Sequence, residues 1–572
     1  MEQACKAVIF NICYVEPIKT VNPIFGFAEF IAAFSLLMVL YTITDTRYKF
    51  RISVAPTSFK KISLISEVFL LTLLIAAGTL LSDVWFERAI DNGWTIPIFL
   101  SVQAYWQGGF AAFFVILLFS WIWYAFIRPP VFSKNNYFRF IQRLYQEIVK
   151  GSEVDLPIIA NELARSAKNI VKYSDNEIPR WQLDKEDPKQ KGKFNIGRCA
   201  YELLLLIGNR KLCKYIISHT PNTAIAFFEE VTRSERYQVP LGTFATNIAT
   251  EAFLNNDSIL YHEDEGYYSG LIGYIKPFSK AVFGNCKLIG SLSHQSPFDI
   301  HYKIMHDLDS SQLKAYAKSF LLFVEDCLVN STIDTHSTTF NRALNNITES
   351  CRGLHKLEGV SDFGNIDAYN KLSVITDFLR DLIKILNEKD KTVSRRKIRS
   401  KELFNDYHDS IARSMLDVIF NASLVKEPSD TNWWIQYSIV WNNFFIHAES
   451  GSAQKIIHYR LRRLIYSEIK QMEDFPNYKS IKILGFCLNV MGFVKSNEKI
   501  SYNYKTFKAL HKSVLSWTQK NYLKIREQNI DVVESGLMGT ISFDEKEKRL
   551  VKTYAKGLNS EAPKDYLELN HT

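Results

Sequence analysis

Histidines and carboxylates gather between residues 262 and 309, and these groups could carry out metal chemistry. His301 and His306 follow Asp299, and His262 opens an acidic run upstream of them. Imidazole and carboxylate groups are the ligands that zinc and other divalent cations prefer. His301 and His306 do not share a helix face, however, because they are five residues apart. We therefore expect a solvated acidic loop and no metal site, and a membrane-tethered, metal-dependent hydrolase or nuclease is the alternative.

The sequence carries none of the common signatures of nucleotide or nucleophile chemistry. It contains no GxxxxGK[ST] loop for phosphates, no GxGxxG turn after a strand and no GxSxG turn. Its eight cysteines are scattered, without a CxxC pair. Six of them fall in the part that we expect to be cytosolic, where thiols stay reduced, so we expect small buried side chains there, and only Cys5 and Cys13 on the outer side could pair. The sequence thus predicts no cofactor, identifies no catalytic residue and favours a protein that is not an enzyme.

Three long apolar runs, at residues 23–43, 62–81 and 108–127, stand near the N-terminus. Each has about the 20 residues that a helix needs to cross the hydrocarbon core of a bilayer. They lack the polar stripe that a helix in a soluble core shows at helical period. The sequence therefore predicts a module of three transmembrane helices over residues 23–130.

The charges of the short loops predict how this module is oriented. The loop between the first two runs carries five basic residues, and the loop after the second run is acidic. Because basic loops stay on the cytoplasmic side, we expect residues 1–22 outside and the chain after residue 130 in the cytoplasm, as in a multi-pass protein of a bacterial inner membrane. The five basic residues are Arg47, Lys49, Arg51, Lys60 and Lys61.

Two carboxylates interrupt the apolar runs, Glu29 in the first and Glu67 in the second. A carboxylate at membrane depth is costly unless it faces water, protein or a partner. We expect both side chains to reach toward the nearest interface. The functional alternative is that they line a polar seam in a homo-oligomer of three-helix modules.

The remainder of the sequence predicts a mainly α fold. Apolar residues recur at spacings of three and four, as in residues 311–330, which follow the cap-competent pair Asp309 and Ser310. No fixed-period repeat is present, which favours an irregular helical bundle or stack. The predicted parts are juxtamembrane helices over 131–173, a polar linker over 174–197, a helical domain over 198–530 with two lobes split near 387–401, and a charged tail over 531–572.

This organisation, a small membrane module followed by a large all-α cytosolic domain, predicts a membrane effector. The domain is expected to sense or bind a cytosolic protein or nucleoprotein, and the module to perturb the inner membrane on activation. Antiphage defence of the abortive-infection type is the setting that this architecture favours by analogy. The net charge of +9 suits a protein beside anionic lipid and does not by itself imply nucleic acid. A membrane-anchored scaffold is the main alternative.

Overall fold

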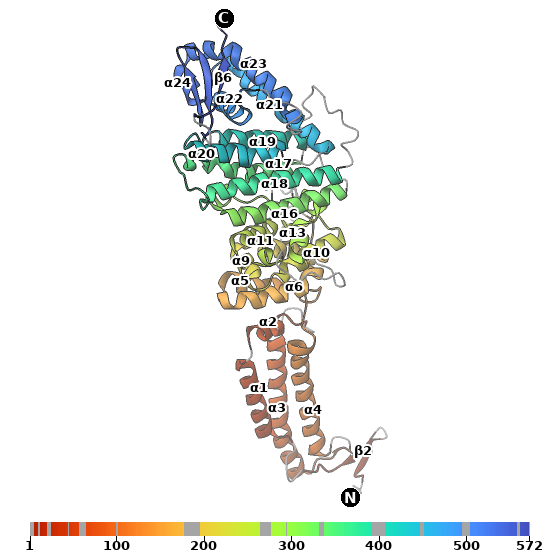
Figure 1. Cartoon of the computed structure of the whole chain (residues 1–572). Helices are drawn as coiled ribbons and strands as arrows, with labels where there is room; N and C mark the ends of the chain where they lie inside the picture. The colour runs from red at the N-terminus through yellow and green to blue at the C-terminus, as the bar shows by residue number, and fades with distance from the viewer. Residues whose placement is uncertain are drawn as a thin grey trace, which may run out of the picture. The chain divides into compact units, whose positions relative to one another are not determined.

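The computed structural model of the protein consists of two compact units, residues 1–240 and 241–572, which are described separately (Figure 1). Both are built mainly from helices, which confirms the mainly α prediction. The structure describes residues 5–9, 12–19, 25–43, 45–56, 64–98, 101–176, 195–263, 276–292, 295–330, 337–390, 406–446, 451–494, 504–556 and 561–570.

Three apolar helices of the first unit lie side by side: α1 (Phe27–Ile43), α3 (Leu64–Asp91) and α4 (Gln103–Ile122), which continues as the π-helix η2 (Trp123–Ile127) (Figure 1). The segments Val68–Asp91 and Gln103–Ile127 are long and apolar enough to cross a membrane. The apolar part of α1, Phe27–Val39, is shorter. Of the three predicted spans, the length and composition of the described helices thus support two.

The three helices pack around a small apolar cluster of Phe30, Ile75, Phe114 and Leu117. The Phe30 and Phe114 rings meet edge to face with their centroids 6.0 Å apart, which joins α1 to α4. A Cβ added at Gly78 would lie 2.5 Å from the Phe110 ring, so glycine allows α3 and α4 to approach closely. Many large apolar side chains of the same helices point outward, with Leu81 64% and Ile116 62% exposed.

A short antiparallel sheet combines two strands that precede the bundle, β1 (Ala7–Ile9) and β2 (Ile12–Val15), with β3 (Ile96–Pro97) from the connection between α3 and α4. A disulfide joins Cys5 to Cys13 of β2, a pairing that the sequence allowed. A second disulfide joins Cys286 to Cys327, whose Cα atoms are 5.1 Å apart. The expectation that these two were separate buried thiols is therefore wrong, because contacting helices of the second unit bring them together.

The other helices in the described part of the first unit are α2, α5, η3, α6, α8, α9 and α10. Helix α6 packs most extensively on α10, and it buries Ile159, Leu163 and Ile170 along one face. The predicted linker over 174–197 lies largely outside the described residues. The bounds are α2 (Thr46–Val54), α5 (Tyr137–Lys150), η3 (Glu153–Asp155), α6 (Leu156–Tyr173), α8 (Ile196–Ile207), α9 (Arg210–His219) and α10 (Asn222–Ser234).

The second unit is a helical assembly in which α16 packs along α18 and α19 packs along α21. Helix α16 begins with a capping box. The Asp309 carboxylate accepts from the backbone N–H of Gln312, and the side-chain oxygen of Gln312 accepts from the backbone N–H of Asp309. The expected division of the helical domain into two lobes near 387–401 stays a prediction, because residues 391–405 lie outside the described part.

The helices of the second unit are α11 (Gly242–Leu254), α12 (Ile259–His262), α13 (Pro277–Phe283), α14 (Cys286–Ser291), α15 (Tyr302–Asp307), α16 (Ser310–Val329), α17 (Thr338–Glu349), η4 (Ser350–Leu357), α18 (Asp367–Lys389), α19 (Tyr407–Ala422), α20 (Ser429–Trp433), η6 (Trp434–Ile446), α21 (Ser452–Lys470), η7 (Gln471–Glu473), α22 (Tyr478–Met491), α23 (Tyr504–Gln528) and α24 (Ile530–Ser535).

The chain after residue 531 differs from the predicted charged tail. It completes α24 and then forms the antiparallel sheet β4 (Ile541–Asp544), β5 (Arg549–Thr553) and β6 (Lys564–Glu568), in that order. Leu550 and Leu567 lie opposite each other in the register and are buried. In β5, buried and partly exposed side chains alternate over only five residues. Such a short alternation, surrounded by many charged residues, is not recognisable as a strand in the sequence.

Candidate functional site

A buried ion pair joins α2 to α6 at one end of the bundle of apolar helices. The Arg51 guanidinium donates to the Glu162 carboxylate through Nη2 at 2.6 Å and through Nε at 3.0 Å. The two side chains are 9% and 3% exposed. Arg51 also donates through Nη1 to the Ala125 carbonyl in η2, at 2.9 Å. One side chain thus connects α2, α6 and the end of the last apolar helix, and we call this group of residues the joint.

The sequence explains why the Ala125 carbonyl is available to Arg51. In an α-helix its partner would be the amide of residue 129, and in a π-helix the amide of residue 130. Both positions are proline and have no N–H to donate. A buried carbonyl without a partner is costly, and the guanidinium satisfies it. Pro129 and Pro130 therefore end the helix and leave an acceptor for the joint.

Further hydrogen bonds fix the segment that leads from the bundle to α5. Asn136 donates through Nδ2 to the carbonyls of Val54, at 2.9 Å, and Val131, at 3.0 Å. On α6, Ser166 Oγ accepts from the Phe132 amide at 3.2 Å, and Asn169 donates to the Phe132 carbonyl at 2.8 Å. The segment between the bundle and α5 is therefore fixed in place, because it forms hydrogen bonds with both α2 and α6.

Polar side chains are buried inside the bundle, in the C-terminal half of α3 and the N-terminal part of α4. Gln103 and Gln107 are 3% and 0% exposed, and Thr79 and Ser82 are 0% and 6% exposed. The two hydroxyls donate to carbonyls of their own helix, at 2.9 Å each. We call these four residues the polar end of the bundle.

The polar end is not predicted by the charge pattern of the apolar runs, because its four residues are uncharged. The available signal was the spacing on α4, where Gln103 and Gln107 continue the inward-facing row of Phe114, Leu117 and Trp121. Spacings of three and four along one row mark the face that packs inside a helical bundle. A polar residue on such a row is buried even when it precedes the apolar run, as Gln103 and Gln107 precede the run at residues 108–127.

The structure places the two predicted membrane carboxylates in the first turns of two different helices. Helix α1 begins at Phe27, so Glu29 lies in its first turn, where the exposed carboxylate accepts from the Gly26 amide at 3.0 Å. This contact caps the helix N-terminus. Glu67 lies in the first turn of α3, and its side chain lies outside the described residues. A seam formed by these two residues stays a prediction.

The histidines of the metal hypothesis are exposed: His262, His301 and His306. His301 Nδ1 accepts from the Lys303 amide at 3.3 Å and so begins α15. Asp299 accepts from the amide and hydroxyl of Ser296, both at 2.7 Å, and its other oxygen pairs with Arg342. Within the part of the chain that the structure describes, no three His, Cys, Asp or Glu residues form a group that could hold a metal ion.

His458 on α21 is a buried titratable group in the second unit. Burial, together with the nearby Arg462 charge, lowers the pKa of His458 to about 4 from its usual value of 6.5. The imidazole is 5% exposed and lies 5.2 Å from the Phe445 ring. The folded protein therefore holds this histidine neutral.

This burial predicts a loss of stability in acid. Because the unfolded chain binds a proton at His458 below pH 6.5 and the folded chain does so only near pH 4, stability should fall as the pH drops through this window, by about 3 kcal/mol. Thermal unfolding of the purified protein between pH 7 and pH 4.5 measures this effect. His458→Leu should show a smaller drop, and an equal drop in both proteins would contradict the assignment.

Comparison with known proteins gives no family for the chain. No protein family model matches it, and no curated protein matches its sequence. A crystal structure of an engineered protein aligns with 70% of this chain and 99% of its own, at 12% sequence identity and a TM-score of 0.21. A likeness this weak carries no argument. The functional proposal therefore depends on the geometry of the chain itself.

Proposed function

We propose that the chain is a membrane effector in which α1, α3 and α4 cross the inner membrane and the soluble helices control them through the joint. The observation that carries this proposal is the bond of Arg51 to both Glu162 and the Ala125 carbonyl. A scaffold needs only an anchor and a tether. A buried charge pair between a soluble helix and the end of a span is instead suited to transmitting movement.

The proposal takes α1 as a third span although it has only 17 residues. A helix of this length rises about 26 Å, slightly less than the roughly 30 Å of a bilayer core, and local thinning of the bilayer accommodates such a difference. Support comes from its packing on α3 and from the outward side chains of Ile31, Leu36 and Val39, which are 47%, 63% and 51% exposed.

Activation, in this proposal, begins when the soluble part binds a cytosolic protein or nucleoprotein. A shift of α6 would then move Glu162 and, with it, the end of η2. The polar end supplies groups that could face water if the spans separate or assemble in a homo-oligomer. Antiphage defence of the abortive-infection type remains the proposed setting, by architectural analogy.

The topology is tested with reporters for each side of the membrane in the full chain. Reporters at the N-terminus and beside Asn92 should report the outside, and one after Gly151 should report the cytoplasm, because the loop charges follow the positive-inside pattern. A chain with two spans would instead place the N-terminal reporter in the cytoplasm. An outside signal after Gly151 would overturn the whole proposal.

A further inference from the structure

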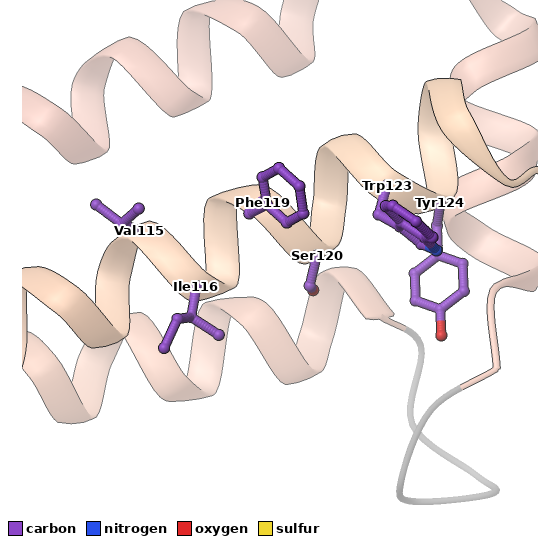
Figure 2. A pocket seen from close by; sticks show the side chains of 6 residues that line it. All are labelled: Val115, Ile116, Phe119, Ser120, Trp123 and Tyr124. Atoms are coloured by element: carbon purple, nitrogen blue, oxygen red, sulfur yellow. The ribbon is translucent and has the colours of Figure 1, made fainter.

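A shallow apolar hollow lies on the outer face of the last apolar helix, with a volume of about 430 Å³. Figure 2 shows that all of its lining side chains come from α4 and η2. They form two neighbouring rows at a spacing of four residues. The first row is Val115, Phe119 and Trp123, and the second is Ile116, Ser120 and Tyr124.

The small Ser120 side chain leaves a notch in the second row, between Ile116 and Tyr124 (Figure 2). The end of the hollow nearest η2 is aromatic, since it is formed by Trp123 and Tyr124. Tryptophan and tyrosine prefer the level of the lipid headgroups, because one edge of the ring is apolar and the other is polar. The hollow thus runs from the hydrocarbon level to the headgroup level.

Positive charge follows directly on the aromatic end of the hollow. The Arg128 amide bonds to the Trp123 carbonyl at 2.7 Å, which keeps Arg128 one turn beyond the hollow. Arg128 and Lys134 are both exposed. From residue 92 to residue 146 the sequence has no Asp or Glu, and it has four basic residues. Helix α2, which contacts η2, adds Arg47 and Lys49 against one carboxylate, Asp45.

We propose that this surface binds an anionic phospholipid, with an acyl chain in the hollow and the phosphate at Arg128 and Lys134. The inference rests on the proposed membrane function and adds the class of lipid. The positive charge beside the hollow favours a lipid over a second copy of the chain as the bound partner. Two copies that met in parallel through this face would bring their positive ends together, which is unfavourable, whereas a phosphate complements them.

The test uses the full chain in nanodiscs of phosphatidylcholine with a minor share of phosphatidylglycerol, and in phosphatidylcholine alone. Native mass spectrometry after release from the discs counts the retained lipids and the protein copies. The protein should retain phosphatidylglycerol severalfold above its share in the bilayer. The double variant Arg128→Gln with Lys134→Gln should lose this enrichment, and Ser120→Trp, which fills the notch, should lose it without any change of charge.

The matched control is Lys287→Gln with Lys303→Gln, which removes two exposed charges of the second unit and should keep the enrichment. If this control lost the phosphatidylglycerol enrichment to the same extent, the enrichment would depend on net charge alone, and the proposal would be overturned. Dimers that retain no lipid would overturn it in favour of a second copy. A chain that enters both bilayers without enrichment refutes the lipid site alone, and a chain that enters neither also refutes the membrane function.

Discussion

Glu162→Gln is expected to destabilise the protein by about 3 to 5 kcal/mol, because it leaves the Arg51 guanidinium buried without its carboxylate. The measurement is thermal unfolding of the purified full chain in detergent, together with its abundance in the membrane. The control is Glu202→Gln, which removes the exposed partner of Arg198 and should cost less than about 1 kcal/mol. Similar losses for the two variants would show that the joint is no stronger than a surface pair.

A second variant separates the stability of the joint from its proposed role in transmission. Arg51→Met with Glu162→Leu removes both charges, and apolar replacement of a buried pair is often neutral or stabilising. Part of the stability should remain lost, since the Ala125 carbonyl then has no donor from Arg51. We expect this variant to reach the membrane and to be inactive as an effector. Full activity would make the joint a purely structural contact.

The second large effect is expected at the polar end of the bundle. Gln107→Leu keeps the approximate size of the side chain and removes an amide from a position that is 0% exposed. If this amide helps to form a polar path, depolarisation of the membrane by the active protein should fall severalfold. Membrane abundance should be unchanged or higher, because leucine enters the bilayer more favourably than glutamine.

The control for this variant is Phe113→Leu, an outward position on the same helix that is 41% exposed. It should leave depolarisation unchanged. Both variants are compared at equal membrane abundance by recording a potential-sensitive dye in cells. Unchanged depolarisation by Gln107→Leu would assign this glutamine to packing alone.

The sequence was most informative about the apolar helices, because their signal is local. A run of about 20 apolar residues is visible in any window of that length. The boundaries were less accurate: the second run was expected to end at residue 81, whereas α3 continues to Asp91. The last residues of α3 alternate polar and apolar groups, with Phe86 and Ala89 facing inward, so their mean hydropathy conceals a helix that continues.

The joint could not be predicted, because its contacts are long-range. Arg51 and Glu162 are 111 positions apart, and no periodic pattern connects them. The sequence predicts Arg51 only as one of five basic residues of a loop, whereas the structure buries it. Only Pro129 and Pro130 carried a usable signal, since they predict a helix end with unpaired carbonyls. The two prolines indicate that the unpaired carbonyls need a hydrogen-bond donor, but they do not identify Arg51 as that donor.

The central claim is tested most directly by following membrane potential and growth together in cells that express the full chain and are arrested by it. The account predicts that depolarisation begins before growth slows. It also predicts that Arg51→Met with Glu162→Leu, at equal membrane abundance, leaves the potential intact. Growth arrest at an undisturbed potential, or equal depolarisation by the joint variant, would contradict the proposal that soluble helices act on the membrane through this contact.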